Sequence, residues 1–130
     1  MNVIELFGKE TDLVTMPARE ALFRAGEDPA GGVMYVLMQG SVDILVGDTI
    51  VETAGPGALL GEMGLIDPAK RSATAIVRSE CRFVRIDMKR FHLLIQQTPE
   101  FATHVMKVIV KRLRSMDAKL LEMQAAMKNR

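Results

Sequence analysis

Residues 55–77 read GPGALLGEMGLIDPAKRSATAIV, and the rest of the chain is organised around this stretch. Gly61 lets the backbone approach a ligand without a Cβ in the way, and residues 62–65 can form one helical turn whose unpaired amide N–H groups favour an anion. Nine residues after Glu62, Arg71 offers a planar guanidinium that suits two phosphate oxygens. A carboxylate that accepts from sugar hydroxyls, free amides and an arginine together predict a sugar-phosphate site.

The spacing of this stretch, GEMGL at 61–65 and then RSAT at 71–74, closely resembles the phosphate-binding cassette of the cyclic nucleotide-binding domain family. That family includes bacterial catabolite activators, regulatory subunits of cyclic-nucleotide-dependent kinases and gated ion channels. The resemblance extends over about Leu13 to Leu121 and includes LFRAGEDPAGGVMYVLMQGSVDIL and VRIDMKRFHLLIQQTPEF. It implies an α+β, mainly β fold: an eight-stranded antiparallel jelly roll (a double-stranded β-helix, cupin-like) with flanking helices and a long C-terminal helix.

The composition is that of an ordinary globular domain. At 130 residues, with 48% hydrophobic and 25% charged residues, the chain has room for one domain with a proper core. It shows no apolar run of membrane-spanning length and no signal-peptide pattern, so we expect a cytoplasmic protein without membrane contact. The single cysteine, Cys81, excludes an internal disulfide framework, and His92 and His104 lack companion ligands, so we expect no metal site.

The net charge of +1 is unevenly distributed along the chain. Residues 100–130 carry seven Lys/Arg against three Asp/Glu, which leaves residues 1–99 at about −3. We interpret the basic end as the solvated face of a helix. Nucleic-acid binding is the less favoured alternative, because no aromatic residues are interleaved for base stacking.

Short apolar segments separated by glycine-rich turns predict an antiparallel sandwich or roll over residues 13–87. The expected strands are two short ones or one bent one within 13–23, two within 33–47 around Gln39-Gly40, and one each at 49–54, 72–79 and 81–87. We place 81–87 at an edge of the same sheet. Helices are expected at 2–8, at 88–97 and, after Thr98-Pro99, at 99–128.

The resemblance assigns a role to each cassette residue. Glu62 stands where the family's glutamate holds the ribose 2′-hydroxyl, and Arg71 where its arginine neutralises the cyclic phosphate. Backbone amides and a hydroxyl after the arginine complete the phosphate site. The alternative is that Glu62 and Arg71 merely pair with each other. The predicted ligand-binding residues of the cassette are Gly61, Glu62, Met63, Arg71, Ser72 and Ala73.

The base is expected to lie between the roll and the long helix. Alignment with the family places Ile44, Val51 and Ala54 on the roll side, against the purine face. Met116 and Asp117 stand where catabolite activators carry a Thr-Ser pair that reads adenine. A serine follows the cassette arginine, only a partial analogue of the threonine often found in kinase domains that prefer cGMP. We therefore expect cAMP as the ligand, with cGMP as the alternative.

The long helix carries a second pattern, a heptad seam of apolar residues at spacings of three and four. We expect its early positions to cover the roll and its later ones to meet a second chain, in the parallel homodimer that the resemblance implies. Met116 belongs to both the seam and the base lid, so nucleotide binding can be coupled to dimer geometry. The seam consists of Met106, Ile109, Leu113, Met116, Leu120, Met123 and Met127.

The sequence shows no catalytic constellation: no nucleophile with a paired base, no set of metal ligands and no Walker loop, so we do not expect an enzyme. The sequence ends at Arg130, directly after the long helix, so we expect no DNA-binding helix-turn-helix. We expect a stand-alone receptor that does not bind DNA directly and acts on an unknown effector protein. The alternatives are a dimerisation or protein-interaction module that binds no nucleotide, and the sensor fragment of a larger catabolite-activator-type regulator.

Overall fold

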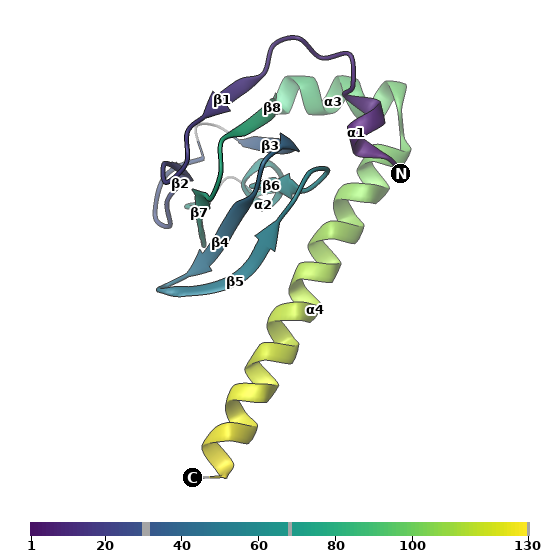
Figure 1. The fold of residues 1–130 in the computed structure, drawn as a ribbon. Coiled ribbons are helices and arrows are strands. Elements are labelled where there is room, and N and C mark those ends of the chain that lie inside the picture. Colours follow the sequence, from purple (N-terminus) through teal and green to yellow (C-terminus); the bar gives the residue numbers. More distant parts are fainter. Residues whose placement is uncertain (30–31, 68, 130) are drawn as a thin grey trace.

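The computed structural model describes residues 1–29, 32–67 and 69–129. The described residues form two four-stranded antiparallel sheets, with strand orders β1-β8-β3-β6 and β2-β7-β4-β5. A long helix, α4, begins beside the roll and extends beyond it (Figure 1). The two sheets with flanking helices confirm the predicted fold, a mainly β jelly roll.

The first sheet contains β1 (Val14–Met16), β8 (Cys81–Asp87), β3 (Val33–Gln39) and β6 (Leu59–Leu60). The second contains β2 (Ala21–Phe23), β7 (Thr74–Val77), β4 (Val42–Val46) and β5 (Thr49–Ala54). The helices are α1 (Val3–Leu6), α2 (Glu62–Ile66), α3 (Met88–Gln97) and α4 (Glu100–Lys128).

Strand β8 is an interior strand, so its expected position at a sheet edge is wrong. It pairs with β1 on one side and with β3 on the other, where Phe83 lies opposite Val14 and Leu37 respectively. The preceding strand, β7, belongs to the second sheet. Exposed Arg82 and Arg85 along β8 reflect contact with solvent on part of its surface. Such a pattern does not report whether the edges of a strand are paired.

The first sheet is covered on both faces. Leu37 and Phe83 are fully buried between the two sheets. Val36 and Ile86 are fully buried on the other side, where they pack with Phe101 of α4. Consecutive residues of β3 therefore point into two different cores, which explains its nearly continuous apolar sequence. The first sheet is therefore held between the helices on one face and the second sheet on the other.

The helices begin and end at residues that the sequence marks clearly. The side chain of Asp87 accepts a hydrogen bond from the backbone N–H of Arg90 at 2.8 Å and caps α3. Helix α3 ends at Gln97, and Pro99, with φ −56°, stands directly before the first residue of α4. Helix α1 is shorter than the predicted range of 2–8, and the side chain of Asn2 caps it.

The start of α4 anchors this helix to the domain. Phe101 and Val105 are buried, and the Phe101 ring lies 6.0 Å from the Phe7 ring and 6.1 Å from the Phe91 ring, between centroids. Met106, the first residue of the predicted seam, is 58% exposed, so the expectation that it covers the roll is wrong. In the described part of the chain, no helix has both the length and the apolar character needed to cross a membrane.

Replacing Phe101 by alanine removes the ring on which α1, α3 and α4 meet. Large-to-small changes of this kind at a fully buried site cost about 3–5 kcal/mol, so we expect a large loss in the free energy of unfolding, measured by urea denaturation. Leu121→Ala, at a site 65% exposed on the same helix, is the control and should change this free energy by less than about 0.5 kcal/mol. A small effect of Phe101→Ala would mean that α4 is not anchored through this ring.

Candidate functional site

A cavity of about 450 Å³ lies between the second sheet, the cassette and α4. Apolar side chains line it from the strands, among them Ile44 of β4 and Val51 of β5. Arg71 and Glu62 line it from the cassette, and Arg112 lines it from α4. The cavity therefore combines an apolar wall with buried groups of both charges, which is typical of a small-molecule site.

The guanidinium of Arg71 is buried in the cassette wall. It donates hydrogen bonds to the carbonyl of Gly61 at 3.1 Å and to the carbonyl of Val33 at 2.9 Å. Its Cζ lies 4.3 Å from the centre of the Phe23 ring, within cation–π range. Burial lowers the pKa of Arg71, and the nearby charges of Glu27 and Glu62 oppose that shift. The side chain stays a cation near neutral pH, and its other N–H groups can serve an anion.

Two glycines make room for this arginine. A Cβ on Gly61 would lie 2.5 Å from Nη1 of Arg71, and a Cβ on Gly64 would lie 2.6 Å from the same atom. Gly61 also has a φ of +73°, in the region that favours glycine. The glycines of GEMGL are therefore explained by the close approach of the guanidinium to the backbone.

The second charged group of the cassette, Glu62, is 2% exposed at the first position of α2. Its Oε1 accepts a hydrogen bond at 2.6 Å from Nη1 of Arg112, which reaches the cavity from α4. Among the described residues, no ion pair joins Glu62 to Arg71. The alternative that these two side chains merely pair with each other is not what the structure shows.

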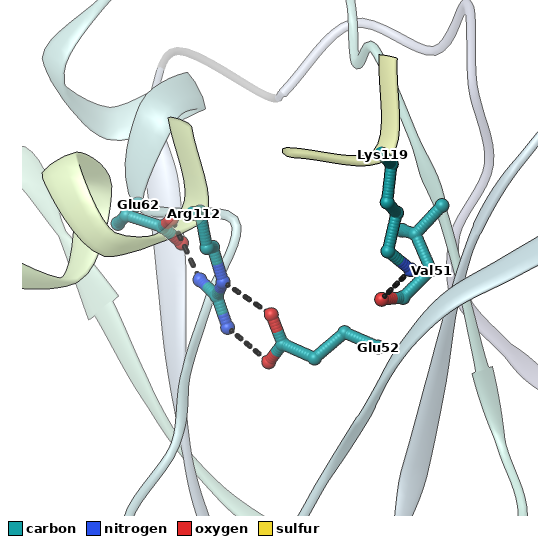
Figure 2. Close-up of polar contacts among 5 residues, drawn as sticks. All are labelled: Val51, Glu52, Glu62, Arg112 and Lys119. Atoms are coloured by element: carbon teal, nitrogen blue, oxygen red, sulfur yellow. Dashed lines mark hydrogen bonds and ion pairs between the residues drawn. The ribbon is translucent and has the colours of Figure 1, made fainter. Parts of the chain in front are cut away.

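Arg112 also binds a second carboxylate, that of Glu52 on β5, as Figure 2 shows. Its Nε and Nη2 donate to the two oxygens of Glu52 at 3.0 and 3.1 Å. Burial opposes the charge of Arg112, but the hydrogen bonds and charges of Glu52 and Glu62 outweigh it and raise the pKa of this guanidinium. Glu52, Arg112 and Glu62 thus form one charge cluster, which we call the carboxylate–arginine bridge.

Most of the predicted ligand-binding residues gather around the cavity. The nine that line it are Ile44, Val51, Gly61, Glu62, Met63, Arg71, Ser72, Ala73 and Met116. Ala54 lies elsewhere: it is 4% exposed, pairs with Val42 and packs between the sheets. Asp117 is exposed and does not line the cavity, because a helix turns by about 100° per residue and Ser115 and Met116 already face it.

Among the cavity residues absent from the prediction, such as Phe23 and Gly64, the most consequential are Glu52 and Arg112. They are 60 positions apart in the chain and meet only in the fold. Arg112 is one of several basic residues between 107 and 119, and residue type alone does not distinguish it from the exposed ones. A usable signal was its position one turn before Met116, on the same face of the helix.

Known proteins with a related sequence include bacterial transcriptional regulators, a cyclic nucleotide-gated potassium channel and a cAMP-dependent protein kinase regulatory subunit. The model of the family described as cyclic nucleotide-binding domain matches residues 13–98. The "cAMP-activated global transcriptional regulator CRP" of Haemophilus influenzae is 31% identical over 119 residues, which cover 87% of this chain and 52% of the relative. The chain thus spans about half the length of the curated relatives that it matches.

Solved structures agree with this relationship. The c-di-GMP-responsive global regulator CLP of Xanthomonas campestris superposes with a TM-score of 0.76 at 26% identity, over 91% of this chain and 61% of that one. A protein of a cyclic-GMP-dependent signalling pathway in bacterial phytopathogenesis gives a TM-score of 0.72 at 27% identity, over 87% of this chain and 94% of that one. From the family match and these likenesses, the chain belongs to the cyclic nucleotide-binding domain family.

Proposed function

We propose that this chain is a cytoplasmic receptor that binds a cyclic nucleotide in the cavity and regulates a partner protein through α4. The observation that carries the proposal is the buried guanidinium of Arg71, held against two carbonyls and an aromatic ring at the cavity wall. A cyclic nucleotide carries one negative charge on its phosphate. A fixed cation in a partly dry cavity binds such a charge more strongly than an exposed arginine does.

The other parts of the ligand match the remaining walls of the cavity. In the proposed complex Glu62 accepts from the ribose 2′-hydroxyl, while the backbone of Ser72 and Ala73 donates to the phosphate. Ile44 and Val51 offer an apolar surface to the base. Met116 of α4, which is 40% exposed, covers the base from the helix side.

We propose cAMP as the preferred nucleotide, with cGMP as the alternative. The serine after Arg71 supports this choice, because the resemblance associates a threonine there with cGMP. The curated relative with 31% identity is described as cAMP-activated, which agrees. The solved structure from a cyclic-GMP-dependent pathway is what keeps cGMP as the alternative.

Calorimetric titration of nucleotide-stripped protein tests the proposal. We expect saturable binding of cAMP at micromolar concentration or tighter, with weaker binding of cGMP. Arg71→Ala removes charge-assisted hydrogen bonds worth about 1.5–3 kcal/mol each, so affinity should fall by about 100-fold or more.

Arg82→Ala, at an exposed site on β8, is the matched control and should bind as the unchanged protein does. Because Arg71 is buried, each variant is first shown to be folded by circular dichroism. Absence of heat with either nucleotide, in folded and empty protein, would favour the interaction module. If Arg71→Ala bound cAMP with the same affinity as the unchanged protein, Arg71 would not be a phosphate-binding residue.

A second copy of the chain is the first candidate for the partner. The side of α4 that carries most of the seam is exposed: Leu113 is 59%, Leu120 55% and Met127 71% accessible. A heptad stripe of this kind on a projecting helix suits a parallel two-helix interface. The same stripe also supports the alternative of a dimerisation module that needs no nucleotide.

Leu120→Lys places a charge on this stripe and should convert a dimer into a monomer, measured by sedimentation velocity over a range of protein concentrations. Ala118→Lys adds the same charge at an exposed position off the seam and should leave the dimer intact. A dimer that survives Leu120→Lys would show that the second copy does not bind through this stripe.

A further inference from the structure

The outer part of α4 is held to the roll by polar contacts. The residues of α4 that belong to the apolar core are Phe101, Val105, Val108 and Ile109, all in the first part of the helix. No later residue in the described part of the helix belongs to that core. Beyond them, Arg112 reaches Glu52 and Glu62, and Nζ of Lys119 donates to the carbonyl of Val51 at 2.7 Å (Figure 2). The position of this part of the helix over the cavity therefore depends on charge.

The carboxylate–arginine bridge is asymmetric. Glu52 takes two N–H groups of Arg112 in a side-on pair, and Glu62 takes one. Bidentate pairs are the stronger and more directional arrangement, so Glu52 sets the orientation of the guanidinium. Within the described residues, Arg112 donates a hydrogen bond to only one oxygen of Glu62.

This division matters because Glu62 is almost completely buried, with its side chain 3% exposed, whereas that of Glu52 is 36% exposed. A buried carboxylate gains more from pairing with a guanidinium than a hydrated one does. Without Glu52, Arg112 would turn and pair with both oxygens of Glu62. The carboxylate that is to accept from the ribose 2′-hydroxyl would then be occupied.

We propose that Glu52 is a positioning residue of the nucleotide site. It holds Arg112, and with it α4, over the cavity before the ligand arrives, and it leaves one oxygen of Glu62 available to the sugar. The part that concerns the sugar rests on the proposed function; the part that concerns the helix does not. No contact between Glu52 and the nucleotide itself is required.

The sugar part is tested by titrating Glu52→Gln with cAMP and with 2′-deoxy-cAMP. We expect Glu52→Gln to bind cAMP about 10-fold more weakly than the unchanged protein does. Its affinity for 2′-deoxy-cAMP should stay within about 2-fold of the unchanged protein's affinity for 2′-deoxy-cAMP, because the loss acts through the carboxylate that receives the 2′-hydroxyl. In an Arg112→Gln background, adding Glu52→Gln should cause no further loss for cAMP.

Removal of one negative charge near the cavity could by itself change the affinity for an anion. Asp67→Asn removes the same charge from another exposed part of the cavity rim and should tighten both nucleotides to the same small extent. Three results would overturn the sugar part: equal weakening of both nucleotides by Glu52→Gln, the same weakening without Arg112, or tighter binding of the kind that Asp67→Asn produces.

The helix part is tested without nucleotide. Spin labels on Asp48→Cys, in the exposed β4–β5 turn, and on Gln124→Cys report the distance from the roll to α4, in a Cys81→Ala background diluted with unlabelled protein. We expect one narrow distance distribution with Glu52 present, and a longer one with Glu52→Gln, because Arg112 then keeps its contact with Glu62 on α2 but loses its contact with β5. Glu52→Asp, which keeps the charge, should restore most of the narrow population.

The two failures are distinguishable. If the unchanged protein binds no cyclic nucleotide, the proposed function fails, and the label distances still decide whether Glu52 positions α4. If nucleotide binds but Glu52→Gln leaves both the distance distribution and the cAMP affinity unchanged, the proposed function stands and the role of Glu52 is wrong.

Discussion

The buried guanidinium of Arg71 is the constraint on which the geometry of the cassette depends. A charge removed from water is costly unless hydrogen bonds or opposite charges replace the lost hydration. Here the carbonyls of Gly61 and Val33 and the face of Phe23 provide part of that replacement. The arginine can reach these groups only because residues 61 and 64 have no side chains. The glycines, the turn into α2 and the burial of Arg71 are thus one structural solution.

This arrangement also fixes the position at which an anion binds most favourably. The backbone of Arg71 is tied to the turn before β3, since its N–H donates to the carbonyl of Glu27 and its own carbonyl accepts from Gly26. The guanidinium is therefore held from both its backbone and its side chain. Little reorganisation is needed when an anion enters, and such preorganisation favours binding.

Much of this arrangement could be predicted from the sequence, because it follows from local patterns. The cassette, the helix start at Asp87 and the break at Pro99 depend on residues close together in the chain. The interior position of β8 could not be predicted in this way, because the pairing of its two edges involves segments far away in the sequence. For the same reason the ion pair of Glu52 and Arg112 could not be predicted, because it forms only where β5 and α4 pack together.

The lid shows how an error of one residue arises on a helix. Alignment with the family placed Met116 and Asp117 over the base, whereas the structure places Ser115 and Met116 at the cavity. The helical face toward the roll is set upstream, where Phe101 and Val105 are buried, and it continues through Arg112 at intervals of three and four. Asp117 falls outside this face for the same reason that Leu113 does.

Two faces of α4 thus serve different purposes, and they are rigidly connected. Arg112 binds the roll, while Leu113, the next residue, lies on the exposed stripe. Any rotation that moves Arg112 relative to Glu62 must also turn Leu113 and shift Met116, which lies at the border of the two faces. A ligand changes this equilibrium only through its different affinities for the two helix positions. In the proposed receptor, contact of the base with Met116 supplies such a difference, and the stripe transmits it to the partner.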